Sequence, residues 1–293
     1  MSMLPNTTMT GKVCVVTGAT SGLGAVTARE LARLGAAVVI VGRSLERCGM
    51  AVNQIKEQIA SPSVDYLVAD LSSQLAIRDL AAQFRTRYDH LDVLVNNAGA
   101  IFVKRQESID GIESTLALNH LAYFLLTNLL LDVLKESAPA RIVNVSSVAH
   151  ERAEIDFEDL QYRRGYRPFK AYARSKLANL LFTYELDRRL AGTGVTVNAV
   201  HPGLVRTDLG AKNGWLSRLG NALVHLRYRR FSVSPDEGAR TIVFLAASPQ
   251  VEGVTGRYFV DLQSVPSSER SYDLDAGRKL WKTSTRMTGL PTS

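Results

Sequence analysis

Apolar positions along the chain fall in short runs rich in Val and Ile, separated by longer segments with helical spacing. Seven such runs can be recognised: KVCVVTG, AAVVIVGR, SVDYLVADL, LDVLVNNAG, ARIVNVSSVA, VTVNAVHPG and GRYFVDL. Several are apolar almost throughout, which is typical of parallel strands covered by helices on both faces. The alternation predicts βαβ units with right-handed crossovers, and therefore a doubly wound α/β sheet of seven parallel strands.

The segments between these runs indicate one domain. LGAVTARELARLG and SIDGIESTLALNHLAYFLLTNLLLDVLKE carry helical spacing, and no linker rich in Pro, Gly or Ser divides the chain. We therefore predict a single domain over residues 10–265, followed by a C-terminal helix and tail over 266–293. Residues 204–234 stand out as irregular, because they lie between the sixth run and a helix expected to begin at SPDE.

Composition supports a folded protein. The chain has 293 residues, of which 46% are hydrophobic, and this is enough to bury a full core. No stretch approaches the roughly 20 apolar residues of a membrane span, and MSMLPNTTMTGK lacks the blocks of a signal peptide. These features predict a cytoplasmic protein. Cys14 and Cys48 form no metal-ligand spacing and no disulfide framework, so no metal is expected.

Basic residues exceed acidic ones, and the formal net charge is +7. The charges are scattered except in RRGYRPFK (163–170) and HLRYRRF (225–231). Neither cluster lies in a recognisable nucleic-acid-binding module, so we predict no nucleic-acid partner. A solvated basic face is the simplest interpretation, and an anionic cofactor or an acidic membrane surface are the alternatives.

A glycine-rich turn follows the first predicted strand and leads directly into a helix. Its sequence, TGATSGLG, has the spacing G-x-x-x-G-x-G. Glycines let the backbone approach a pyrophosphate, while the N–H groups and dipole of the helix attract its charge. An ordinary tight turn would look similar, but the position after the first strand of a βαβ series favours a dinucleotide site. The predicted binding residues are Gly18, Thr20, Ser21, Gly22, Leu23 and Gly24.

The ends of the next strands indicate which dinucleotide would bind. NAD-binding proteins usually carry an acid at the end of the second strand, where it accepts a hydrogen bond from the ribose 2′-OH. Here the strand ends in Arg43, which can hold a 2′-phosphate in a bidentate manner. We therefore predict NADP(H) in preference to NAD(H), with a solvated Arg43 as the alternative. The third predicted strand ends in Asp70 and Leu71, which are expected to lie near the adenine. The fourth ends at the same edge of the sheet and adds Asn97, Ala98 and Gly99 to the predicted cofactor-binding residues.

Tyr172 and Lys176 lie four positions apart in YARSK, at the head of the apolar segment LANLLFTYEL. Such a pair shares one helix face, but it also occurs by chance on helix surfaces. The Tyr172 and Lys176 pair becomes informative because five separated elements occur in a set order along the chain. They are TGATSGLG, the Asp70 strand end, NNAG, the Ser147 and YARSK pair, and HPGLVRT at 201–207. With these elements the chain resembles the short-chain dehydrogenase/reductase family over roughly residues 10–265. It is most similar to the branch of retinol dehydrogenases and protochlorophyllide-reductase-like proteins.

The resemblance implies a Rossmann-type sheet with strand order 3-2-1-4-5-6-7 and an active site without a metal. It implies that Tyr172 is the general acid/base, that Lys176 assists it and binds the nicotinamide ribose, and that Ser147 holds the substrate oxygen. Asn119 would support a water-linked proton path, and the nicotinamide amide would be anchored by Pro202, Gly203 and Thr207. Ser147 and Tyr172 are 25 positions apart, a longer gap than the family usually has, because the branch carries an insertion there.

A phenol that titrates near about 10 is a poor base at neutral pH unless its anion is stabilised. The positive charge of Lys176, one turn along the same helix face, would supply that stabilisation. A Ser–His hydrolase pair formed by Ser147 with His120 or His150 is rejected, because the G-x-S-x-G elbow is absent. His201 is interpreted as a strand-end residue.

The segment NGWLSRLGNALVHLRYRRF places apolar residues near one helical face. In the resembled family this region closes over the substrate, so we expect a lid over residues 204–234 and a lipophilic carbonyl or alcohol substrate. A core-facing helix, or shallow docking at a membrane surface by residues 213–231, are the alternatives. The predicted function is an NADP(H)-dependent oxidoreductase, with a non-catalytic NADP(H)-binding sensor or scaffold as the alternative. The resemblance makes a homodimer or a homotetramer possible, since both are common in the family, and the sequence does not decide between them.

Overall fold

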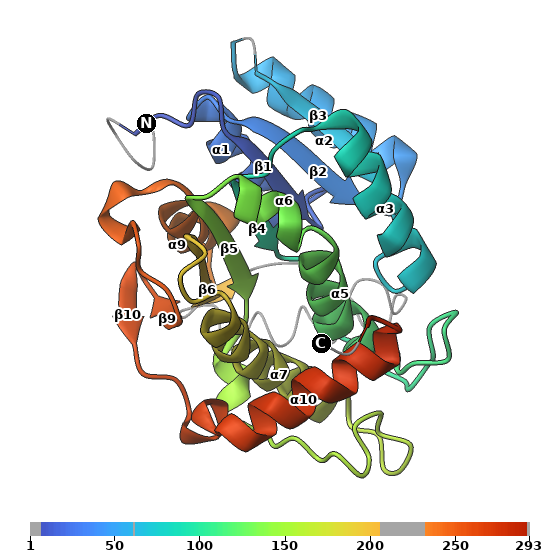
Figure 1. Cartoon of the computed structure of the whole chain (residues 1–293). Coiled ribbons are helices and arrows are strands. Elements are labelled where there is room, and N and C mark those ends of the chain that lie inside the picture. The colour runs from blue at the N-terminus through green and yellow to red at the C-terminus, as the bar shows by residue number, and fades with distance from the viewer. Residues whose placement is uncertain (1–6, 61, 206–231, 292–293) are drawn as a thin grey trace.

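The main sheet of the protein has eight strands. In the computed structural model, which describes residues 7–60, 62–205 and 232–291, their order is β10-β9-β6-β5-β4-β1-β2-β3 (Figure 1). The strands are β1 (Val13–Thr17), β2 (Ala37–Gly42), β3 (Val64–Val68), β4 (Val93–Asn96), β5 (Ala140–Val145), β6 (Val195–His201), β9 (Arg257–Val260) and β10 (Gln263–Val265). Two short strands, β7 (Leu204–Val205) and β8 (Ser232–Val233), pair in parallel outside this sheet.

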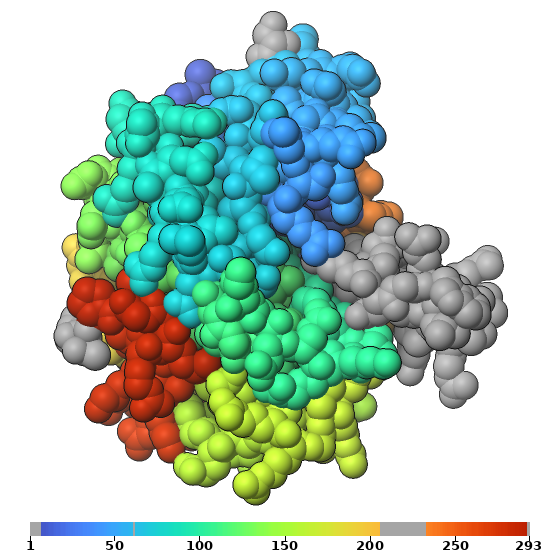
Figure 2. All heavy atoms as spheres, turned by 90° about the vertical axis from the view of Figure 1, so that its right-hand side faces the viewer, coloured from blue at the N-terminus to red at the C-terminus, as the bar shows by residue number. Residues whose placement is uncertain are grey.

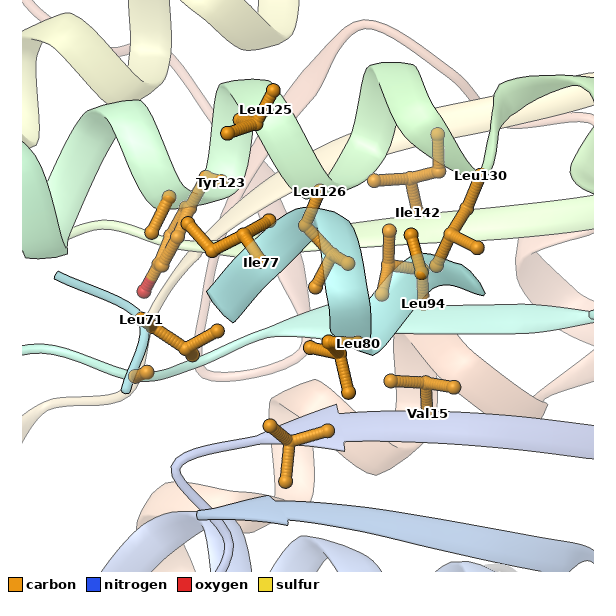
Figure 3. Close-up of a cluster of buried hydrophobic side chains, with 14 of the residues drawn as sticks. Val15, Leu71, Ile77, Leu80, Leu94, Tyr123, Leu125, Leu126, Leu130 and Ile142 are labelled. Carbon is orange, nitrogen blue, oxygen red and sulfur yellow. The ribbon is translucent and has the colours of Figure 1, made fainter. Parts of the chain in front are cut away.

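Helices cover both faces of the sheet, which confirms the doubly wound α/β fold. Val13 and Val15 of β1 face one apolar core, while Cys14 and Val16 face the other. The first core, part of which is shown in Figure 3, is closed by α3 (Gln74–Arg87), α5 (Ala122–Leu129) and α7 (Pro168–Arg189). The second is closed by α1 (Gly22–Arg33), α2 (Leu45–Gln58) and α9 (Pro235–Ala247). Burial on both faces explains why the strands are apolar almost throughout.

The predicted count of seven strands is wrong by one. The first seven strands follow the expected order, with β9 as the seventh, and β10 then pairs with β9 in the antiparallel direction. The two residues between them, Asp261 and Leu262, have φ values of 46° and 66°. A two-residue hairpin turn of this kind needs positive φ at both positions, and Asn-Gly is its usual sequence signal. Because Asp-Leu lacks that signal, the sequence did not reveal the hairpin.

Strand order reverses beside β1, which pairs with β2 on one side and with β4 on the other. Ligands of doubly wound sheets bind in the crevice at the carboxyl ends of the strands where the order reverses. The loops after β1 and β4 carry the motifs TGATSGLG and NNAG. The topology therefore brings the predicted cofactor residues to one edge of the sheet.

The long apolar segment after residue 113 is not one continuous helix. It comprises α4 (Ser114–Leu116), a π-helical turn η1 (Ala117–Leu121), α5 and α6 (Leu131–Glu136). The side chains of Asn119 and His120, both in the π turn, are fully buried. A π turn adds one residue to a helical turn and often occurs at functional sites. Here it turns two successive polar side chains into the protein interior.

The C-terminal helix α10 (Leu274–Thr288) packs across α7 (Figure 1). Its Trp281 meets the rings of Phe124 and Phe182 at centroid distances of 4.9 and 5.9 Å. Its last turn also reaches α3, where Gln74 Nε2 donates to the Met287 carbonyl at 2.8 Å. Figure 2 shows this red segment against the cyan surface of α3. α10 thus joins two helices that belong to the same face of the sheet.

Candidate active site

A cleft of about 960 Å³ lies at the carboxyl edge of the sheet. The glycine turn, Tyr172 and Lys176 all line it. The predicted residues that line it are Gly18, Thr20, Ser21, Gly22, Leu23, Gly24, Arg43, Asp70, Leu71, Asn97, Ala98, Gly99, Ser147, Tyr172, Lys176, Pro202 and Gly203. Asn119 is buried behind the lining. Thr207 lies outside the described residues, as do residues 206–231 of the expected lid and therefore all of 213–231.

Glycine is required on steric grounds at two positions of the turn. Gly18 has φ +67°, and a Cβ there would lie 2.7 Å from the Cα of Ala98. A Cβ on Gly24 would lie 2.5 Å from Asn97 Nδ2. The N-cap residue Ser21 makes no side-chain hydrogen bond to the first turn of α1. Backbone N–H groups at the beginning of α1 are therefore left for a ligand, and the positive end of the helix dipole favours an anion there.

Asn97 and Thr17 fix the loop after β4 against β1. Asn97 Nδ2 donates to the Thr17 carbonyl at 2.8 Å, and the Thr17 hydroxyl accepts from the backbone N–H groups of Asn97 and Ala98 at 2.9 and 3.1 Å. These bonds show why an Asn follows the strand. Sequence reasoning missed Thr17, although its position immediately before the first glycine was a usable signal.

Two guanidinium groups line the cleft near the end of β2. Arg43 is exposed, as the prediction of a 2′-phosphate contact requires. Arg47, on the first turn of α2, also lines the cleft and donates from Nη2 to Ser21 Oγ at 3.3 Å. Sequence reasoning missed Arg47, although its place in the first turn of the helix that follows the second strand was a usable signal. The nearby carboxylate of Asp70 accepts from the backbone N–H of Ser72 at 2.9 Å and from its hydroxyl at 2.7 Å.

Lys176 is held under the cleft with little contact with solvent. Its side chain is 3% exposed, and Nζ donates to the Val145 carbonyl at 2.9 Å. The ring centroids of Tyr172 and Tyr123 lie 5.6 and 5.7 Å from Nζ. Burial lowers the pKa of Lys176 to about 7, because the charged form loses its hydration. The ammonium group is therefore poised to change charge near neutral pH.

Tyr172 and Ser147 both line the cleft, and their side chains share a hydrogen bond. Burial raises the pKa of the Tyr172 phenol, and a hydrogen bond with the Ser147 side chain acts in the opposite direction. Ser146, by contrast, is 2% exposed and donates its hydroxyl proton to the Lys176 carbonyl at 2.9 Å. Ser147 is therefore the serine of the pair whose side chain is directed at Tyr172.

Asn119 is fully buried and bonds to the main chain at Ala100 and to the side chain of Ser175. Its Nδ2 donates to the Ala100 carbonyl at 3.0 Å and to Ser175 Oγ at 3.1 Å, while Oδ1 accepts from the Ala100 N–H at 2.9 Å. A Cβ on Gly99 would lie 3.3 Å from Asn119 Oδ1 and 3.7 Å from Lys176 Nζ. Gly99 thus lets the main chain pass over both groups.

Residues between Tyr172 and Lys176 have structural roles that the sequence did not reveal. Ser175 bonds to Asn119, and Arg174 holds the insertion that precedes α7. Arg174 donates to the carbonyls of Glu154 and Asp159 at 3.1 and 2.6 Å, and its guanidinium lies 3.8 Å from the centroid of the Tyr162 ring. The added residues between Ser147 and Tyr172 are thereby fastened to the helix that carries Tyr172.

The histidines near the site form no hydrolase pair. His150 Nδ1 lies 2.7 Å from the backbone carbonyl of Ser147 rather than from its hydroxyl. His120 is fully buried, and burial lowers its pKa to about 4. His201, the last residue of β6, lines the cleft, and burial lowers its pKa to about 4 as well. All three are expected to be neutral at pH 7.

Comparison with known proteins agrees with this geometry. A family model described as short chain dehydrogenase matches residues 12–214. Mouse Retinol dehydrogenase 14 is 44% identical, with 96% of this chain and 87% of the relative covered. Human Polyprenol dehydrogenase is 43% identical, with 95% and 86% covered.

Solved structures show the same likeness. A putative uncharacterized protein from Mycobacterium paratuberculosis superposes with a TM-score of 0.80 at 35% identity, and 100% of this chain and 99% of that one are covered. A putative NAD(P) dependent gluconate 5-dehydrogenase from Beutenbergia cavernae, with bound NADP, superposes with a TM-score of 0.70 at 28% identity. The match covers 87% of this chain and 96% of that one.

Proposed function

Since the chain belongs to the short chain dehydrogenase family, we propose that it interconverts a hydrophobic alcohol and its aldehyde or ketone, using NADP(H). The observation that supports the proposal is one cleft lined both by the hydrogen-bonded pair Tyr172 and Ser147 and by the helix N-terminus at Ser21, which has no side-chain cap. Lipophilic substrates are supported by the apolar lining residues Phe102, Leu118 and Val205, and by relatives named for retinol and polyprenol.

The described residues fit a nicotinamide dinucleotide. Gly18 and Gly24 leave space that a Cβ would fill, and the N–H groups of α1 would hold the pyrophosphate. Arg43 and Arg47 would pair with a 2′-phosphate, which favours NADP(H) over NAD(H). Asp70 and Leu71 would lie at the adenine end. When bound, the cofactor supplies or accepts a hydride.

The chain's own groups would handle the proton and the substrate oxygen. Tyr172 gives its phenolic proton to the oxygen of a carbonyl substrate, and Ser147 donates a hydrogen bond to the same oxygen. A positive Lys176 stabilises the phenolate that remains, because its Nζ lies 5.6 Å from the Tyr172 ring. Asn119 holds the main chain at Ala100 and, through Ser175, the helix that carries both residues.

The direct test is oxidation of NADPH by the purified protein with a panel of lipophilic aldehydes, followed spectrophotometrically. Tyr172→Phe should lower kcat by about 100-fold or more, which is the usual contribution of a general acid, while the Kd for NADPH changes little. Tyr88→Phe is the matched control, because its hydroxyl bonds to the Asp65 carboxylate and Tyr88 is not among the residues that line the cleft.

Full activity of Tyr172→Phe would refute the assigned role. Tight NADPH binding by the wild-type protein, without turnover of any aldehyde, alcohol or ketone offered, would instead support a sensor or scaffold.

A further inference from the structure

Four buried side chains link the C-terminal helix to the cleft. Ser284 of α10, His120 of the π turn, and Asn179 and Lys176 of α7 are each at most 3% exposed. Ser284 Oγ lies 3.0 Å from His120 Nε2, and His120 Nδ1 lies 3.3 Å from Asn179 Oδ1. Asn179 Nδ2 then donates to the Val145 carbonyl at 3.4 Å. Lys176 Nζ donates to that same carbonyl at 2.9 Å.

The direction of each bond follows from the groups available. Asn179 Nδ2 is a donor to Val145, so Asn179 Oδ1 is the acceptor for a proton on His120 Nδ1. His120 is neutral, which leaves Nε2 as an acceptor for the Ser284 hydroxyl proton. The Val145 carbonyl can only accept, so it selects the orientation of the Asn179 amide, and this orientation selects the His120 tautomer. The Ser284 hydroxyl, which can donate or accept, completes the chain by donating to His120 Nε2.

This orientation matters at Lys176 because two donors share one carbonyl oxygen. The Asn179 amide directs its N–H group, rather than its oxygen, at the acceptor of the ammonium group. The titratable side chains that face Nζ are the phenols of Tyr172 on α7 and Tyr123 on α5. Within the part of the chain that the structure describes, no carboxylate forms an ion pair with Lys176. The Asn179 amide therefore competes with the Lys176 ammonium group for the Val145 carbonyl, and no neighbouring carboxylate among the described residues compensates by stabilising the charged amine.

We propose that His120 is a positioning residue, which transmits the docking of α10, through Asn179 and the Val145 carbonyl, to the Lys176 amine. The same side chain also fixes the π turn, where its neighbour Asn119 bonds to Ala100. The proposal rests on the assigned role of Lys176 for its effect on catalysis. The link itself can be measured without any turnover.

Ser284→Ala removes the hydroxyl and leaves His120 Nε2 without its donor. The His120 ring is then held by one bond fewer and its bond to Asn179 weakens. The Val145 carbonyl is consequently shared less with Asn179 and more with Lys176, which stabilises the charged form of the amine. The expected result is an upward shift of roughly half to one unit in the titration midpoint of Lys176. The midpoint can be measured from the pH dependence of trace acetylation at Lys176, quantified by mass spectrometry on the folded full chain.

Thr288→Val is the matched control, because it deletes another fully buried α10 hydroxyl, whose bonds within the described residues go to the backbone carbonyls of Ser284 and Thr285 and not to His120. It should leave the midpoint unchanged. His120→Asn should raise the midpoint as Ser284→Ala does, and the double variant should shift it no further, since both act through one chain of bonds. An unchanged midpoint in Ser284→Ala, an equal shift in Thr288→Val, or additive shifts would overturn the proposal.

A separate comparison distinguishes this inference from the proposed function. If the midpoint shifts but no substrate is turned over, the link stands and the proposed activity fails. If the wild-type protein is active and the titration midpoint of Lys176 is the same in Ser284→Ala as in the wild-type protein, the activity stands and the link fails.

Discussion

At the scale of single residues, two arginines carry the proposed preference for NADP(H) over NAD(H). Arg43 and Arg47 both line the cleft near the end of β2, and Arg47 is further tied to Ser21 at the beginning of α1. A guanidinium presents several N–H donors in one plane, which match the oxygens of a phosphate. The pair should therefore distinguish NADPH from NADH.

Arg43→Ala is expected to raise the Kd for NADPH by about tenfold, since it removes one exposed charge-assisted contact. The Kd for NADH should change less than about twofold on the same grounds. Fluorescence titration with both cofactors measures this, and Arg163→Ala, which removes an exposed arginine outside the cleft, serves as the control. Equal losses for NADPH and NADH would remove Arg43 from the choice of cofactor.

At the scale of elements, α7 organises much of the site. It begins at Pro168, carries Tyr172 and Lys176 toward the cleft, and holds the preceding insertion through Arg174. The Arg174 side chain is 8% exposed and bonds to two backbone carbonyls. A buried guanidinium that loses these partners would be costly, and so would the carbonyls left without a donor. The insertion is thus part of the packed structure.

Arg174→Met keeps an apolar stem of similar length but removes both donors. We expect the free energy of unfolding to fall by about 1–3 kcal/mol, and amide hydrogen exchange over residues 154–162 to accelerate more than exchange elsewhere in the chain. Urea denaturation and exchange mass spectrometry provide the two readings. Arg167→Met, at an exposed position of the same segment, should alter neither, and unchanged exchange over 154–162 in Arg174→Met would contradict the role assigned here.

For the whole molecule, buried neutral histidines make stability depend on pH. Burial lowers the pKa of His120 to about 4, whereas an unfolded chain titrates near about 6.5. The unfolded state therefore takes up a proton first as the pH falls. The stabilisation is fully present above about pH 6.5 and is lost progressively down to about pH 4. His201, with its pKa also lowered to about 4, acts in the same direction.

His120→Asn should flatten this pH dependence. From the pKa values, the contribution of His120 across the window is roughly 3 kcal/mol, so the unfolding free energy of the wild-type protein should fall between pH 7 and pH 4.5 more steeply than that of the variant. Urea denaturation at several pH values measures the difference in slope. Parallel curves for the two proteins would show that His120 does not carry this dependence.

Much of the fold could be predicted because its signals are local. Apolar runs such as KVCVVTG reveal strands buried on both faces, and the doubly wound sheet is confirmed. The strand order from β3 to β9, which the family resemblance implied, is confirmed as well. The cleft residues could be predicted for the same reason, since short motifs at strand ends determine which groups reach the carboxyl edge. The hairpin to β10 was missed because Asp261 and Leu262 adopt positive φ without the usual residues for such a turn.

The amino-acid sequence by itself determined the strands, the glycine turn and the spacing that places Tyr172 and Lys176 on one helix face, because these depend on residues adjacent along the chain. Only the tertiary structure decided which distant groups surround them. Arg47 meets Ser21 across 26 positions, and Ser284 meets His120 across 164. Such contacts arise when helices pack against each other and side chains lose their solvent, and no pattern within a single segment encodes them.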